Sequence, residues 1–119
     1  MAQAFKRKLS SSTDGKPIKV AATATLGTAI HTAIASTTAG TFDEIWLWAY
    51  NSDTSPRILT IEFGGASVPD QNIKITLQPN TGLIPILPGL ILQNGMIVSA
   101  FCDVANKVTL SGFINYITD

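Results

Sequence analysis

The residues able to support nucleophilic catalysis centre on one histidine, because a serine or cysteine nucleophile needs a neighbouring base to accept its proton. His31 is the single histidine among the 119 residues. It lies in an Ala/Thr-rich stretch, whereas the candidate nucleophiles Ser99, Cys102 and Ser111 come much later in the chain. No Gly-x-Ser-x-Gly elbow is present. We therefore expect His31 to be structural and the protein not to be an enzyme.

Carboxylates could act as a general acid and base only if two of them shared a cleft. Most acidic residues lie in or beside turn sequences, where an Asp side chain binds local backbone amides. Glu62 is the exception, since it alternates with Leu59, Ile61 and Phe63 along a predicted strand. We expect Glu62 to face away from the core and to bind Lys or Thr side chains across the sheet.

Cofactor sites are not indicated. Cys102 is the only cysteine, so no intramolecular disulfide can form and the usual zinc ligand sets are incomplete. Gly64-Gly65 lacks the lysine and the spacing of a phosphate-binding loop. Eight basic and eight acidic side chains cancel, and no apolar run approaches the roughly 20 residues of a membrane helix. We expect no cofactor, no small-molecule substrate, no membrane contact and synthesis in a cytoplasm without a signal peptide.

Basic residues are concentrated near the N-terminus. The first nineteen residues hold five of the eight basic side chains, namely Lys6, Arg7, Lys8, Lys16 and Lys19. Residues 10–15 are a Ser/Thr/Asp/Gly cluster typical of a flexible connection. We predict a basic arm, residues 1–15, that becomes ordered against the body or a partner. A protein partner is favoured over nucleic acid, because Phe5 is the only aromatic residue among these charges.

Aromatic residues alternate along residues 42–50. Trp46, Trp48 and Tyr50 therefore lie on one face of a predicted strand, and the aliphatic residues between them lie on the other. Trp and Tyr often dominate the binding energy at protein interfaces, so this face is a candidate oligomer interface. Burial beneath the arm or a loop, and stacking on sugars, are the alternatives.

Alternation of apolar and polar residues with a period of two recurs along the chain. It predicts strands at residues 17–22, 28–34, 42–50, 58–63, 73–77, 83–92, 96–102 and 107–117. The stretch 20–39 could instead hold a helical turn, although its β-branched residues favour a strand. The strands on either side of the Asn51–Pro56 turn look like an antiparallel hairpin. Pro85 and Pro88 predict an edge strand or a bend in 83–92.

Short strands, frequent turn residues and the absence of an amphipathic helix predict an all-β domain. The expected architecture is an antiparallel β-sandwich, jelly-roll-like, over residues 16–119, with the arm of residues 1–15 extended from it. The length suffices for one continuous core without disulfides or metals. Only 13% of the residues are charged, so a weakly charged surface is open to neighbouring subunits.

Four segments together resemble the small structural proteins of tailed bacteriophage virions, in particular capsid decoration or cement proteins. They are residues 5–8, 14–23, 43–51 and 111–117. The resemblance covers nearly the full length of the chain and lies in the order of the strands and the general character of the sequence. It implies a β-sandwich on the outside of a capsid, often a homotrimer, with an arm reaching over subunits of the major capsid protein. It assigns no functional residue.

We therefore expect a non-enzymatic virion protein on the capsid surface that binds and stabilises the shell. The binding residues would be the five basic groups of the arm, with Trp46, Trp48 and Tyr50 at an oligomer interface. A head-completion, neck or tail component is the nearest alternative. A carbohydrate-binding β-sandwich that uses the same three rings is the alternative from another class.

Overall fold

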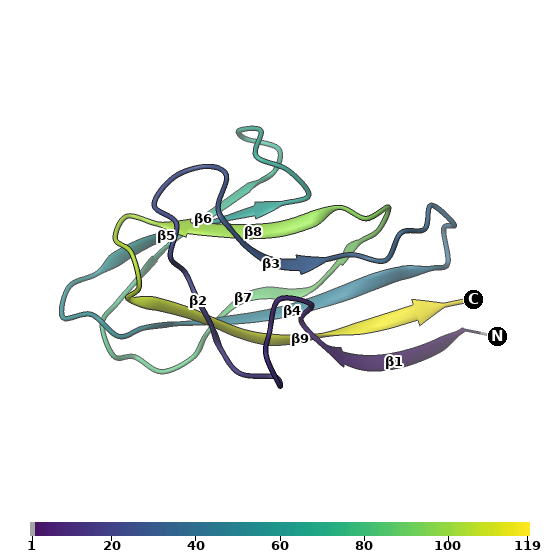
Figure 1. The fold of residues 1–119 in the computed structure, drawn as a ribbon, viewed down its shortest axis with the longest axis horizontal. Coiled ribbons are helices and arrows are strands. Elements are labelled where there is room, and N and C mark those ends of the chain that lie inside the picture. The colour runs from purple at the N-terminus through teal and green to yellow at the C-terminus, as the bar shows by residue number, and fades with distance from the viewer. Residues whose placement is uncertain (1) are drawn as a thin grey trace.

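A computed structural model describes residues 2–119. Within them the chain forms two antiparallel sheets, packed face to face, and no helix (Figure 1). The strands are β1 (Gln3–Lys8), β2 (Ile18–Lys19), β3 (Thr28–Thr32), β4 (Phe42–Asn51), β5 (Arg57–Phe63), β6 (Asn72–Leu77), β7 (Ile84–Leu92), β8 (Ile97–Cys102) and β9 (Val108–Thr118). The predicted antiparallel β-sandwich is confirmed. A helical turn in residues 20–39 is wrong, and the described residues contain no helix that could span a membrane.

Two sheets divide the strands between them. Sheet A has the order β1-β9-β4-β7, with β2 also paired to β9, and sheet B has the order β3-β8-β5-β6. From β2 onward the chain changes sheet at every connection except the one between β5 and β6. The domain measures 48 × 28 × 21 Å.

The turn at residues 51–56 joins the two sheets. The hairpin predicted around it is wrong, because β4 pairs with β7 and β9 whereas β5 pairs with β6 and β8. Asn51 is buried at the start of the turn, and its Nδ2 donates to the carbonyl oxygens of Ser55 and Leu77, each at 3.0 Å. A corner between sheets and a hairpin use the same turn residues, so the sequence pattern does not distinguish them.

Alternation along each strand places the core between the sheets. On β4 every second residue from Asp43 to Asn51 is buried, and the residues between them are half-buried. Ile45, Leu47 and Ala49 lie in the core as predicted, together with Leu59 and Ile61 from the facing sheet. The face of β4 that carries Trp46 and Trp48 therefore points away from sheet B.

The basic N-terminal segment is part of the sandwich. β1 pairs with β9 along its whole length, from Gln3 opposite Thr118 to Lys8 opposite Phe113. Leu9 follows at once and is only 1% exposed, inside the hydrophobic core. The predicted boundary between an arm and a sandwich at residue 15 is therefore not seen, because β1 and Leu9 belong to the sandwich. Residue 1 lies outside the described residues. Ser, Asp and Gly serve equally well in a flexible connection and in an ordered turn, which explains the difference.

Truncating Leu9 tests this contribution to the core. We expect Leu9→Ala to lower the free energy of unfolding by about 2–5 kcal/mol, because it leaves a cavity among buried side chains. Urea denaturation measures the change. Leu83→Ala is the control, since Leu83 is 58% exposed, and it should stay within about 0.5 kcal/mol of the wild type. Equal effects of the two substitutions would contradict a core role for Leu9.

Candidate protein-binding face

The outer face of sheet A, which points away from sheet B, brings together the two features that the sequence singled out. Residues directly paired in an antiparallel ladder share a face. Lys8 is paired with Phe113, and Phe113 on its other side is paired with Trp46. Alternation along β1 and β4 adds Lys6 and Trp48 to the same face. The basic segment and the aromatic strand therefore meet through β9.

Three half-buried rings, Trp46, Trp48 and Phe113, form what we call the aromatic cluster. The ring centroids are 6.4 Å apart for the two Trp residues, 6.1 Å for Trp46 and Phe113, and 6.0 Å for Trp48 and Phe113. The angles between their planes are only 14–27°. Lys6 Nζ lies 4.3 Å from the centroid of Phe113, within range of a cation–π interaction. Phe113 is the functional candidate that sequence reasoning missed, because only the register of β9 reveals it.

Tyr50 does not belong to the aromatic cluster. It lies two residues beyond Trp48, near the end of β4, where its hydroxyl donates to Asn80 Oδ1 at 2.8 Å. The predicted interface of three aromatic residues on β4 is thus regrouped in the structure. Trp46 and Trp48 join Phe113, and Tyr50 instead anchors the connection between β6 and β7.

Trp46 is held on two sides. Its Nε1 donates to Glu44 Oε1 at 2.8 Å, and the same oxygen accepts from Asn115 Nδ2 at 3.1 Å. On the β7 side lies Gly89, where a Cβ atom would come within 2.8 Å of the indole. Gly89 also has a φ of +78°, which a side chain rarely tolerates. A glycine at the irregular part of β7 therefore makes room for the ring.

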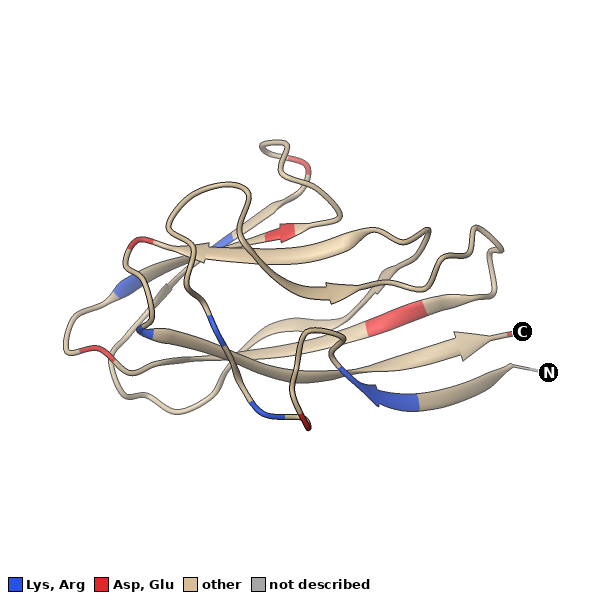
Figure 2. Cartoon of the chain, viewed as in Figure 1, with Lys and Arg blue, Asp and Glu red and all other residues tan. Residues whose placement is uncertain are grey.

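The basic side chains divide between the two faces of sheet A. Register and alternation place Lys6, Lys8 and Lys19 on the outer face, and we call these three the lysine row. Lys8 Nζ also donates to the carbonyl oxygen of Ser12 at 2.9 Å. Lys16 is exposed in the turn before β2, and Arg7 points to the opposite face. Figure 2 shows the basic segments of β1 and β2 along one edge of the sheet.

On that opposite face the guanidinium carbon of Arg7 lies 4.5 Å from the centroid of the Tyr116 ring. Phe5 stacks on the same ring, with centroids 6.1 Å apart. β1 is therefore fixed to β9 by aromatic contacts on both faces as well as by backbone hydrogen bonds.

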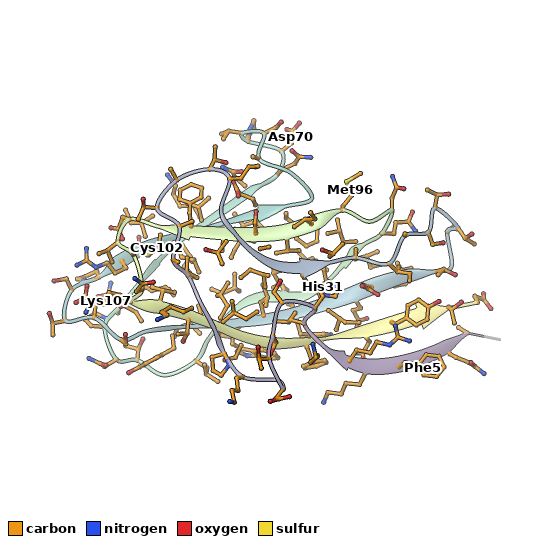
Figure 3. The ribbon with its side chains drawn as sticks, in the orientation of Figure 1. Phe5, His31, Asp70, Met96, Cys102 and Lys107 are labelled. Atoms are coloured by element: carbon orange, nitrogen blue, oxygen red, sulfur yellow. The ribbon has the colours of Figure 1, made fainter. Side chains whose placement is uncertain are left out.

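His31 lies between the sheets, as Figure 3 shows. Its Nδ1 accepts from the Ser10 N–H at 3.0 Å, so the ring proton is on Nε2 and is donated to Asp43 Oδ2 at 2.7 Å. Asp43 Oδ2 also accepts from the Ile34 N–H at 3.1 Å. Nε2 thus joins β3 of sheet B to β4 of sheet A, and Nδ1 joins β3 to the segment that follows β1. This arrangement fits a structural role for His31.

The other residues considered for catalysis lie apart from His31. The Ser99 hydroxyl donates to Glu62, and Ser111 is paired with Trp48 on the outer face of sheet A. Cys102 is fully buried, and this burial raises the pKa of its thiol. Among residues 2–119, no three His, Cys, Asp or Glu side chains are grouped as a metal ion would require.

Glu62 faces outward from sheet B as predicted, yet it is only 1% exposed because the connection between β2 and β3 covers it. Its Oε1 accepts from the Gly27 N–H at 2.7 Å and from Ser99 Oγ at 2.6 Å, and its Oε2 accepts from Thr25 Oγ1. These donors stand in place of the Lys or Thr side chains expected across the sheet, since Ser99 is the cross-strand partner and Thr25 comes from the connection between β2 and β3. Burial raises the pKa of Glu62, but the hydrogen bonds from Ser99, Thr25 and Gly27 outweigh it and leave the pKa below its usual value of 4.5.

Comparisons of the chain with protein-family models, with curated proteins and with solved structures found no match. The functional argument therefore depends on the aromatic cluster and the lysine row.

The contact between Gly89 and Trp46 can be tested against a matched glycine. Gly89→Ala and Gly82→Ala both place a side chain at positive φ, but only at residue 89 does the new methyl group meet another side chain. We expect each to cost about 1–3 kcal/mol of stability from backbone strain, and Gly89→Ala to cost more. Gly89→Ala should also change the tryptophan emission spectrum. Identical unfolding curves and spectra for the two variants would show that Trp46 does not fill the space beside Gly89.

The lowered pKa of Glu62 predicts a specific pH dependence. Its contribution to stability is present above the unfolded pKa, near 4.5, and is lost as the pH falls through the lower folded pKa. Glu62→Gln lacks this contribution, so the difference in unfolding free energy between wild type and variant should shrink below pH 4.5. Glu62→Ala should cost roughly 1–3 kcal/mol for each donor left unpaired. Urea denaturation from pH 3 to pH 7, taken as a rough experimental window, measures both, and a pH-independent difference would refute the assignment.

Proposed function

We propose that the chain is a non-enzymatic structural protein of a virion, a capsid decoration or cement protein that binds the major capsid protein and stabilises the shell. The observation that carries this proposal is the meeting of the aromatic cluster and the lysine row on one sheet face. The resemblance of the sequence to phage decoration proteins supports the choice of partner.

The chemistry of the outer face of sheet A suits a protein partner. Large aromatic side chains near the centre of an interface supply much of its binding energy, and here Trp46, Trp48 and Phe113 are contiguous. The lysine row lies beside them, where charges steer association and orient the partner. Glu44, an acidic residue of this face, is already hydrogen-bonded to Trp46 and Asn115.

The strand order supports the jelly-roll interpretation. Strands β2 to β9 form two four-stranded layers, β2-β9-β4-β7 and β3-β8-β5-β6, and the β5–β6 connection alone stays within one layer. Two Greek keys wound into a sandwich have this pattern, which occurs in viral capsid domains.

Binding in many copies would compensate for a modest interface. A shell presents identical sites, so a trimer that engages three of them gains effective concentration without any new contact. A homotrimer is the oligomer that we favour, because the resemblance to capsid decoration proteins implies it. The aromatic cluster is the candidate surface for the shell, whereas Tyr50, hydrogen-bonded to Asn80, is set apart from it.

Particle binding is the direct test. In virions whose genome encodes this chain, electron microscopy should locate an epitope-labelled copy on the outer capsid surface. Trp48→Ala should weaken rebinding to stripped capsids by about 2 kcal/mol, the size of an interface hot spot, as measured by co-sedimentation. Phe101→Ala is the matched control, since Phe101 is an equally half-buried aromatic residue on β8 of sheet B. It should bind as the wild type does.

The outcomes separate the alternatives. Label at the neck or tail would identify a head-completion, neck or tail component instead. If the protein bound a polysaccharide but not capsids, and Trp48→Ala abolished that binding, the chain would be a carbohydrate-binding module. Equal losses from Trp48→Ala and Phe101→Ala would exclude the outer face of sheet A as the docking surface.

A further inference from the structure

β1 leaves one side of its backbone open. Among the described residues it pairs only with β9, and β2 occupies a separate part of the same strand. All six residues of β1 are exposed. In an antiparallel pair, every second residue directs its N–H and C=O groups away from the partner strand. β1 therefore presents backbone donors and acceptors to solvent along the edge of sheet A, with Phe5 on the same rim (Figure 3).

The other sheet edges differ from this one. β7 carries Pro85 and Pro88 and two register shifts, all of which interrupt strand pairing. β3 is covered by the segment after β1, since the Ser11 N–H donates to the Ile30 carbonyl at 3.2 Å. β6 has one charged side chain, Lys74. Among the strands of residues 2–119, only β1 combines an open edge with a run of like charge.

The contacts of this run of charge, within the part of the chain that the structure describes, are with aromatic rings and a backbone carbonyl. Lys6 contacts the Phe113 ring, Arg7 the Tyr116 ring and Lys8 the carbonyl of Ser12. Within residues 2–119, none of these three contacts involves an acidic group. Three consecutive positive charges thus line the open edge.

A second copy of the chain is a poor occupant. Pairing β1 with another β1 would gather the positive charges of both copies on one short ladder without an acidic residue, since β1 contains Lys6, Arg7 and Lys8 and no Asp or Glu. An in-register parallel pair would place like charges directly opposite each other, and both effects disfavour self-association of this edge strand. The remaining edge strands β3, β6 and β7 contain no Asp or Glu that could complement the bases. The charge pattern therefore favours a strand from a different chain.

We propose that β1 accepts an acidic, extended segment of a partner protein as an additional strand of sheet A. This inference rests on the proposed function for the identity of the partner, a shell subunit. Main-chain hydrogen bonds would give affinity and side chains would give specificity. Because directly paired residues share a face, acidic residues belong opposite Lys6, Arg7 and Lys8, and an apolar residue belongs opposite Phe5.

A short labelled peptide tests the proposal on the full-length protein. The probe has three successive acidic residues next to a valine, flanked by threonines, and fluorescence anisotropy measures its binding. Alternate amides within residues 3–8 should gain protection from hydrogen exchange when it binds. Lys6→Glu combined with Lys8→Glu should weaken binding by at least about tenfold, because two attractive pairs become repulsive.

Matched variants separate a specific site from general attraction. Lys74→Glu combined with Lys107→Glu changes the net charge equally at exposed sites away from β1, and should leave binding within about twofold at physiological salt. A peptide with lysines in place of its acids should bind the Lys6→Glu/Lys8→Glu variant better than the wild type. This rescue also shows that the variant has kept its fold.

Several results would overturn the inference. Peptide binding without new amide protection in residues 3–8 would exclude strand addition. Equal losses in both double variants would reduce the effect to net charge. Tighter binding of an oligothymidylate of matched charge would assign the edge to nucleic acid.

The two proposals can fail separately. Capsid binding that Trp48→Ala weakens, without any peptide binding or new amide protection in residues 3–8, would remove the strand-addition site and leave the decoration function standing. Peptide binding by a protein that is absent from capsids would do the reverse.

Discussion

The pairing of β9 with strands from three parts of the chain is the constraint on which the rest of the structure depends. One side of β9 holds β1 and β2, and the other side holds β4 over ten residue pairs. β9 contributes Val108, Leu110 and Ile114 to the core while Phe113 faces outward. Because a strand has only two faces, the same alternation that completes the core also builds the outer face of sheet A.

Polar contacts complement this apolar framework at the places where the two sheets would otherwise be joined only by packing. The His31–Asp43 hydrogen bond crosses the sandwich, and Asn51 caps a corner between the sheets. Glu62 attaches the β2–β3 connection to sheet B. Each of these buried groups is satisfied by hydrogen bonds, which limits the cost of removing it from water. The outer face can then be apolar and lightly charged without loss of a unique fold.

Local patterns in the sequence were sufficient for the fold class and for the inner faces of β4 and β5. The alternation around Ile45, Leu47 and Ala49 is unambiguous at a period of two, and turn residues mark most strand ends. Local patterns could not predict which strands pair with each other. The turn between 42–50 and 58–63 predicts a hairpin, because a turn shows where the chain bends and not which strand lies beside it.

The candidate site also combines features that local sequence predicts with features that depend on long-range strand pairing. Lys6 and Trp48 were each identifiable from local composition, yet their common location depends on Phe113, which is more than sixty residues away from either Trp. The ordered state of residues 3–8 likewise depends on residues 113–118. Long-range register carries no local signal, so it had to come from the structure.

The pairing of residues 3–8 with residues 113–118 also imposes an order of events during synthesis. β1 leaves the ribosome before β9 and has to wait for it, since non-local contacts cannot form before both segments exist. Until β9 has been synthesised, the basic strand β1 has no strand of sheet A to pair with. A nascent chain that lacks residues 113–118 is consequently unable to form the ladder between β1 and β9 or to present the completed outer face of sheet A.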